Sequence, residues 1–126
     1  MSNAFIAIID DDDELCYSLV DLMRSVGHRA EPFASAETYL ASCNVPPFDC
    51  IVADVALPGM SGLDLVRKLR EQGEKIAVIL ITALPGARLL EEASSVGAQR
   101  LLRKPFEVAA LLESIERGLS DERPLG

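Results

Sequence analysis

Side chains that could bind a cation and transfer a phosphoryl group follow four apolar runs of this sequence. Asp10 and Asp11 come directly after one run, Asp54 after another, Thr82 ends a third, and Lys104 follows a fourth. Carboxylate oxygens are preferred ligands of hard divalent cations, and a carboxylate can also act as a nucleophile. A hydroxyl and an ammonium group can bind the oxygens of a phosphoryl group in transfer. Each residue also has an ordinary structural explanation. Whether they form a functional site depends on whether the fold brings them close together.

The apolar runs that precede these residues have the length of strands, and helical patterns lie between them. Three of the five runs are almost wholly apolar, which is typical of strands covered by helices on both faces. Capping residues support two of the helices, because Ser35 and Ser61 stand at helix starts and Asp64 has capping-box spacing to Ser61. We predict strands at 5–9, 29–33, 50–53, 76–81 and 99–102, and helices at 15–26, 36–43, 61–72, 89–96 and 108–119.

Five alternating strand and helix units predict an α/β fold with a doubly wound, five-stranded parallel sheet. Right-handed crossovers place helices on both faces of such a sheet, and ligands bind at the carboxyl ends of its strands. The five side chains above all follow strands, so we expect them to meet at one edge. A carboxylate at the end of a buried strand is costly unless it is paired, which makes Asp54 the most informative of them.

Length and charge limit the organisation and the partners of the chain. Its 126 residues suit one domain, for which we predict residues 5–120, with an expression remnant at 1–4 and a tail or truncated linker at 121–126. A net charge of −8 disfavours nucleic acid as a partner of this chain. We find no membrane-spanning run or signal peptide, and three scattered cysteines fit a reducing compartment, so we expect a cytoplasmic protein.

The acidic run from Asp10 to Glu14 divides into two parts. Asp12, Asp13 and Glu14 are explained by the start of a helix, where negative charge is favourable. Asp10 and Asp11 lie at the strand end itself, where we expect a site for a hard cation.

Four stretches of the sequence resemble the receiver domains of bacterial two-component response regulators. They are IAIIDDDDEL, VADVALPGMSGLDLVRKL, VILITA and GAQRLLRKPFEVAALLESI, in the order and spacing of that family. The resemblance is closest to receivers that precede helix-turn-helix DNA-binding domains. It implies strand order 2-1-3-4-5 and a signalling role in a phosphorelay, in which the domain catalyses only its own phosphorylation and dephosphorylation.

The resemblance also implies the roles of individual residues. Asp54 would accept a phosphoryl group from the phosphohistidine of a sensor histidine kinase or phosphotransfer protein. Asp11, Asp54 and the backbone carbonyl of Ala56 would hold Mg²⁺ or Mn²⁺, with Asp10 acting mainly through water. Thr82 and Lys104 would contact the phosphoryl group, and the peptide bond from Lys104 to Pro105 would be cis.

Three positions depart from the usual pattern of the family. Leu101 stands where many receivers carry the aromatic residue that moves during activation. Ala56 and Leu84 stand where polar side chains often influence the attacking water, so we hypothesise a long-lived phosphorylated state. Leu84 could form, together with Leu89, Leu90 and Leu101, an exposed surface for a phosphorylation-dependent homodimer or an output domain; alternatively, Leu89, Leu90 and Leu101 complete the core.

Three other functions compete with this interpretation. A receiver-like module that acts without phosphorylation would explain the departures, although Asp11, Asp54, Thr82 and Lys104 are all present. A haloacid-dehalogenase-like phosphohydrolase would use Asp10 and Asp12, but would leave Asp54 without a role. A flavodoxin-like cofactor module is disfavoured because the first loop is acidic and would repel the FMN phosphate. The sequence identifies neither the kinase and stimulus nor an output domain.

Overall fold

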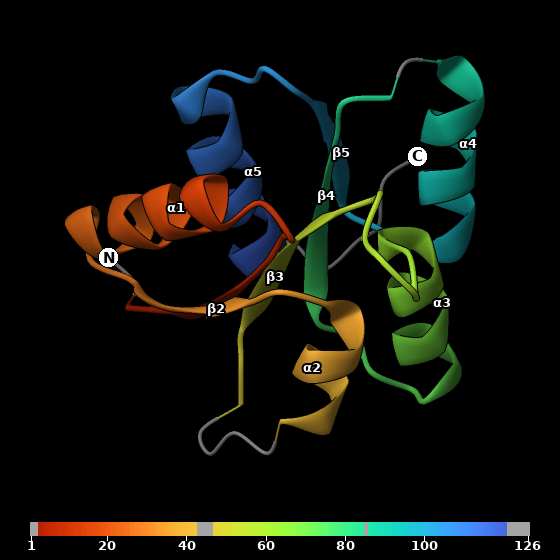
Figure 1. Cartoon of the computed structure of the whole chain (residues 1–126), viewed down its shortest axis with the longest axis horizontal. Helices are drawn as coiled ribbons and strands as arrows, with labels where there is room; N and C mark the ends of the chain where they lie inside the picture. Colours follow the sequence, from red (N-terminus) through yellow and green to blue (C-terminus); the bar gives the residue numbers. More distant parts are fainter. Residues whose placement is uncertain (1–2, 43–46, 85, 121–126) are drawn as a thin grey trace.

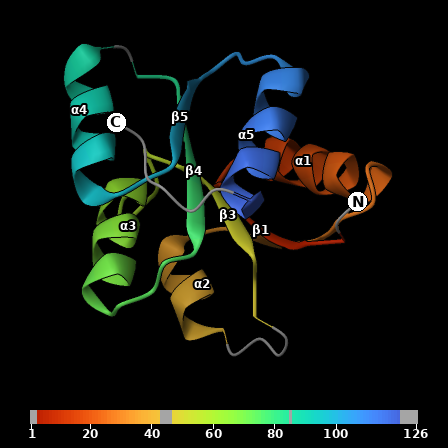
Figure 2. The ribbon, with the colours of Figure 1, turned by 180° about the vertical axis from the view of Figure 1, so that it is seen from behind.

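The described part of this computed structural model, residues 3–42, 47–84 and 86–120, contains a five-stranded parallel sheet and five helices. The strand order is β2-β1-β3-β4-β5, as expected. Strands and helices alternate along the chain (Figures 1 and 2). The strands are β1 (Phe5–Ile9), β2 (Arg29–Phe33), β3 (Cys50–Asp54), β4 (Ala77–Thr82) and β5 (Arg100–Arg103). The helices are α1 (Asp13–Ser25), α2 (Ala36–Ala41), α3 (Gly62–Glu71), α4 (Ala87–Val96) and α5 (Val108–Ser120).

Helices cover both faces of the sheet and enclose two apolar cores. Helices α1 and α5 lie on one face, and α2, α3 and α4 lie on the other (Figures 1 and 2). Because side chains alternate along a strand, Ile6 and Ile8 of β1 pack into the first core, whereas Ala7 and Ile9 pack into the second. Both faces of the central strands are therefore buried, which explains their nearly continuous apolar sequences.

The predicted starts of α2 and α3 are confirmed by their capping hydrogen bonds. The side chain of Ser35 accepts a hydrogen bond from the Thr38 N–H at the start of α2. At the start of α3, Ser61 and Asp64 form a reciprocal capping box. These bonds satisfy backbone donors that have no partner within the first turn of a helix.

The observed boundaries differ from the predicted ones by one or two residues. Strands β4 and β5 each begin one residue later than predicted, and α4 begins two residues earlier. Ala4, which the prediction left outside the fold, is buried, and its carbonyl accepts a hydrogen bond from the Arg29 N–H. Helix α2 ends at Ala41, with Ser42 as its C-cap, before the predicted end at 43. Residue 43 itself, residues 1–2 and the tail at 121–126 lie outside the described residues.

Candidate functional site

The side chains that follow the strands come together at the carboxyl edge of the sheet. Asp10 follows β1, Asp54 ends β3, Thr82 ends β4, and Lys104 follows β5. A backbone hydrogen bond of 2.7 Å from the Lys104 N–H to the Thr82 carbonyl joins the last two strand ends. The predicted grouping is therefore present, because parallel strands bring their carboxyl ends to the same edge.

Three carboxylates form an acidic cluster at this edge. One ligand atom from each of Asp10, Asp11 and Asp54 can be chosen so that all lie within 4.8 Å of one another. Asp10 and Asp54 are buried, whereas Asp11 is exposed. Burial raises the pKa of Asp10 above its ordinary value, although hydrogen bonds from the Asp12 N–H and Lys104 oppose the shift. A set of oxygen ligands this close together suits a divalent cation.

Lys104 balances part of this negative charge. Its Nζ donates to Oδ2 of Asp54 at 2.7 Å and to Oδ2 of Asp10 at 3.4 Å. Burial by itself would lower the pKa of Lys104, but the hydrogen bond to Asp54 and the charges of both aspartates outweigh it and raise the pKa. The ammonium group therefore stays charged, which fits it to neutralise a phosphoryl group.

The Asp54 side chain is held in one orientation by contacts to both of its oxygens. Oδ1 accepts a hydrogen bond of 2.9 Å from the backbone N–H of Ala56, and Oδ2 accepts the bond from Lys104. The backbone behind it leaves no space, since a Cβ on Gly62 would lie 2.5 Å from the Asp54 carbonyl oxygen. Glycine at this position lets α3 begin directly behind the carboxylate.

Thr82 is buried and its hydroxyl is engaged with the following loop. Oγ1 accepts a hydrogen bond of 2.9 Å from the Leu84 N–H. The residue is thus at the predicted edge, with its oxygen bonded to the backbone of the segment that leads to α4.

The rest of the acidic run has the structural role expected of it. Asp12 is the N-cap of α1, and its side chain accepts a hydrogen bond from the Leu15 N–H. Asp13 and Glu14 lie in the first turn of α1, where they interact favourably with the helix dipole. A phosphohydrolase that pairs Asp10 with Asp12 is not supported, because Asp12 is used as a helix cap.

The apolar residues beside the site divide into two groups. Leu89 and Leu101 are partly buried and pack against the core under α3 and α4. Leu84 and Leu90 are exposed, at 50% and 46% of their surface. Leu101 is therefore largely a core residue. The exposed apolar surface beside the site is formed by Leu84 and Leu90, and is smaller than one formed by all four leucines.

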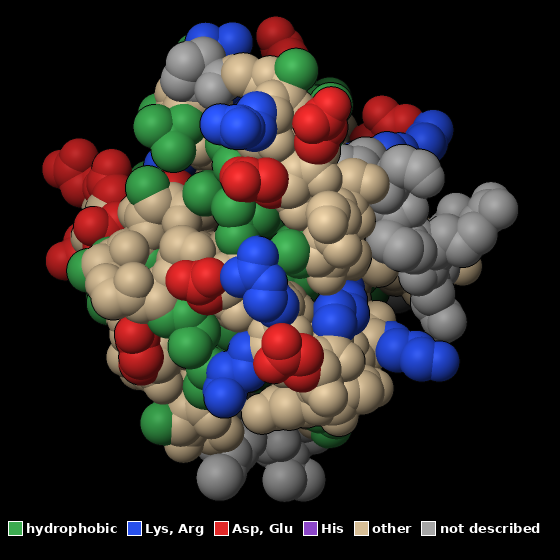
Figure 3. Space-filling model, turned by 90° about the vertical axis from the view of Figure 1, so that its right-hand side faces the viewer, with side chains coloured by type: hydrophobic (Ala, Val, Ile, Leu, Met, Phe, Trp, Pro, Cys, Tyr) green, Lys and Arg blue, Asp and Glu red, His purple; other side chains and the backbone are tan. Residues whose placement is uncertain are grey.

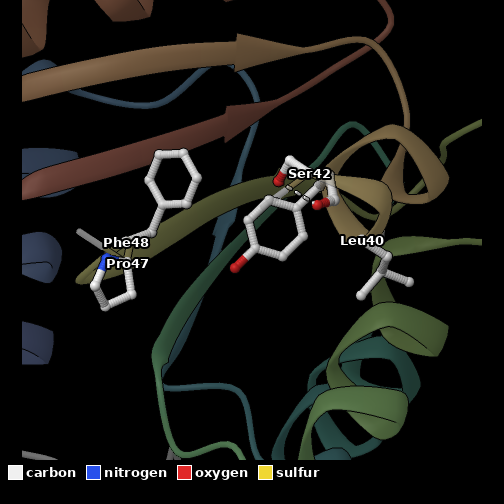
Figure 4. Close-up of a pocket in the computed structure, with 5 residues that line it drawn as sticks. Leu40, Ser42, Pro47 and Phe48 are labelled. Atoms are coloured by element: carbon white, nitrogen blue, oxygen red, sulfur yellow. Dashed lines mark hydrogen bonds between the residues drawn. The ribbon is translucent and has the colours of Figure 1, made fainter. Parts of the chain in front are cut away.

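A pocket of about 200 Å³ lies beside α2, at the opposite end of β3 from Asp54 (Figure 4). It is lined by Tyr39, Leu40, Ser42, Pro47 and Phe48. None of these residues carries a carboxylate or an ammonium group, so the pocket does not extend the acidic cluster.

Sequence reasoning missed one residue that contacts the loop after Asp54. The carboxylate of Glu37, in the first turn of α2, accepts a hydrogen bond from the Met60 N–H. Nothing in the spacing of the two residues predicts this contact.

The chain matches the family model described as the response regulator receiver domain over residues 6–116. The chain belongs to this family. The peptide bond from Lys104 to Pro105 is cis, as the resemblance implies. Receiver domains are phosphoacceptor signalling modules, not enzymes that turn over an external substrate.

Relatives of this receiver domain include longer regulators. It is 38% identical over 114 residues to the response regulator protein TodT of Pseudomonas putida, covering 90% of this chain and 50% of TodT. It is 38% identical over 112 residues to the transcriptional regulatory protein FixJ of Azorhizobium caulinodans, covering 89% of this chain and 53% of FixJ. The chain thus spans about half the length of the curated relatives it matches.

Solved receiver structures have the same fold. The crystal structure of FixJ-N matches with a TM-score of 0.86 at 30% identity, covering 96% of this chain and 97% of that chain. The BeF3-activated receiver domain of DrrB matches with a TM-score of 0.84 at 28% identity, covering 94% and 99%. Among the described residues, no helix combines the length and apolar character needed to cross a membrane.

Proposed function

We propose that Asp54 accepts a phosphoryl group from the phosphohistidine of a sensor histidine kinase or phosphotransfer protein. The observation that carries this proposal is the pair of contacts from Lys104 to Asp54 and Asp10, beside the acidic cluster. An ammonium group between two carboxylates, at the ligand-binding edge of the sheet, suits neutralisation of a transferring phosphoryl group.

The residues present fit a divalent cation. Two of the three carboxylates, Asp10 and Asp54, share the ammonium group of Lys104 among the ion pairs of the described residues, which leaves negative charge in the cluster to balance. Asp11, Asp54 and the Ala56 carbonyl would hold Mg²⁺ or Mn²⁺, and Asp10 would reach it through water. Such an ion neutralises charge that develops on the phosphoryl oxygens.

The transfer is a displacement at phosphorus. An oxygen of Asp54 forms the new O–P bond in line with the N–P bond of the phosphohistidine, which breaks as the imidazole leaves with its electron pair. Lys104 neutralises the incoming charge while it remains protonated. The product on this chain is an acyl phosphate.

Phosphorylation would then act through Thr82 and the loop behind it. In the structure the Thr82 hydroxyl accepts a hydrogen bond from the Leu84 N–H. When the hydroxyl turns to a phosphoryl oxygen, it would exchange the Leu84 N–H for that oxygen as its hydrogen-bond partner. Movement of the segment from Leu84 into α4 would shift the population between two conformations, which present different surfaces to a partner. Leu101 supplies no aromatic ring to this switch.

The surface that responds would serve a second copy of the chain or an output domain. Leu84 and Leu90 are exposed there. Figure 3 shows the side formed by α3 and α4, where hydrophobic side chains are interspersed with charges of both signs. FixJ and TodT are named as regulators, and we infer by analogy a DNA-binding output domain in a cytoplasmic parent protein.

Light scattering with and without beryllofluoride tests the homodimer, and an unchanged monomer at high concentration would contradict it.

Intact mass spectrometry after incubation with acetyl phosphate and Mg²⁺ tests the proposal directly. We expect one phosphoryl adduct on the wild type, and none with EDTA or in the Asp54→Asn variant. An adduct that persists in this variant would contradict Asp54 as the acceptor. An unmodified wild type, also after incubation with phosphorylated histidine kinases, would favour a module that acts without phosphorylation.

A further inference from the structure

We propose that Glu37 is a positioning residue that holds the loop between β3 and α3 and thereby sets the affinity of the acidic cluster for Mg²⁺. The inference rests on the proposed function, because it takes the Ala56 carbonyl in that loop as a ligand. The carboxylate lies on α2, outside the residues that would contact the cation or the phosphoryl group.

Helix α2, which carries this carboxylate, is held in place by capping and packing contacts. Its N-terminus is capped by Ser35, and Ala36 is fully buried in the core. The ring of Tyr39 packs edge-on against Phe33, with 5.5 Å between ring centroids, and at a tilt against Phe48, with 5.7 Å between centroids. Glu37 thus lies on a helix that is held by a capping residue, a buried alanine and aromatic contacts.

Glu37 binds the tip of the loop. Its Oε2 accepts a hydrogen bond of 2.8 Å from the Met60 N–H. Gly59 has a φ of +74°, and a Cβ there would lie 2.5 Å from the same Oε2. The close approach of the carboxylate therefore depends on glycine at position 59.

The base of the loop is closed by separate bonds. The Val55 N–H donates to the Ile81 carbonyl, and the Val55 carbonyl accepts from the N–H groups of Leu57 and Gly62. Ala56 lies between this base and the tip held by Glu37. The Ala56 N–H is also bonded to Oδ1 of Asp54, so loss of the Glu37 bond frees the tip of the loop while these other bonds remain, and the Ala56 carbonyl would be less well placed for a cation.

Titration calorimetry with Mg²⁺ on three variants tests the inference. Glu37→Ala removes the acceptor, and we expect the dissociation constant to rise about three- to tenfold, the effect of one hydrogen bond. Glu37→Gln keeps an acceptor oxygen without the charge and should bind as the wild type does. Glu71→Ala removes another exposed carboxylate, from α3, and controls for net charge. Equal affinity in Glu37→Ala and the wild type would overturn the inference.

Hydrogen exchange at the Met60 amide gives a readout independent of the cation. We expect faster exchange in Glu37→Ala than in the wild type or Glu37→Gln, without Mg²⁺. Gly59→Ala should displace the Glu37 carboxylate and weaken Mg²⁺ binding, whereas Gly73→Ala should not, since its φ of +81° is similar but no atom lies within 4 Å. Unchanged exchange of Met60 in Glu37→Ala would also overturn the inference.

The two proposals fail in different ways. If the wild type neither binds Mg²⁺ nor accepts a phosphoryl group, the proposed function is wrong. If the wild type does both and Glu37→Ala binds Mg²⁺ equally well, only the role of Glu37 is wrong.

Discussion

The side-chain ammonium of Lys104 lies 2.7 Å from a carboxylate oxygen of Asp54, although fifty positions separate the two residues in the chain. The same ammonium lies 3.4 Å from a carboxylate oxygen of Asp10, so the Lys104 side chain links the ends of β1, β3 and β5. The second oxygen of Asp54 is held by the Ala56 N–H. These contacts orient the carboxylate before any partner arrives, which reduces the entropic cost of transfer.

Replacing Lys104 by glutamine should have opposite effects on catalysis and on cation binding. Phosphorylation by acetyl phosphate should slow by about a hundredfold or more, because a charge that stabilises the transition state is lost. Mg²⁺ should raise the melting temperature more in the variant than in the wild type, since the carboxylates lack their ammonium partner. Lys75→Gln, at an exposed lysine, is the matched control. A normal phosphorylation rate in Lys104→Gln would count against the assigned role.

Replacing Thr82 by alanine should separate phosphorylation from the structural response. Asp54 and Lys104 remain, so beryllofluoride should still bind, but the chemical shifts of α4 should change much less than in the wild type. Thr82→Ser keeps the hydroxyl and should respond normally. Two-dimensional amide NMR makes the comparison, and equal responses in Thr82→Ala and the wild type would contradict the switch.

The phosphorylated state should persist for minutes or longer after the phosphodonor is removed. Ala56 and Leu84 are exposed beside the site, and neither side chain can orient an attacking water by a hydrogen bond. Replacing Ala56 with asparagine should shorten the lifetime several-fold. Mass spectrometry of desalted samples over time gives both half-lives, and a wild-type half-life of seconds would refute the hypothesis.

Stability should fall at high pH because of Cys50. Full burial raises the pKa of its thiol from 9.0 to about 12, so the thiol stays protonated in the folded chain where the unfolded chain loses its proton. The unfolded state then binds fewer protons, and the free energy of unfolding should fall by about 1.4 kcal/mol per pH unit between about pH 9 and 12.

Urea unfolding of the wild type and Cys50→Ala measures this contribution. The variant should be less stable at neutral pH because it leaves a cavity, but its stability should fall less steeply above pH 9. Parallel pH dependences of the two proteins would show that Cys50 is not responsible. Iodoacetamide should label Cys50 only in the unfolded chain.

The sequence alone determined which helices and strands form and which side chains lie at the carboxyl edge of the sheet. Apolar strands and helical periodicity are local properties, and parallel order then places Asp10, Asp54 and Thr82 at one edge. The fold class and the grouping of the site were predictable for this reason, whereas the strand order came from the resemblance to receiver domains. The capping residues Ser35 and Ser61 were readable because a cap depends on neighbours a few positions away.

Tertiary packing decided the contacts that make the site specific. The reach of Lys104 to two carboxylates depends on how far β5 lies from β1 and β3, which periodicity does not encode. The same holds for the division of the leucines, because Leu89 and Leu101 reach the core while Leu84 and Leu90 do not. Glu37 meets Met60 only because α2 packs beside a loop that begins fourteen residues after the helix ends. Such contacts follow from the angles and paths of packed elements, and local sequence patterns carry no record of them.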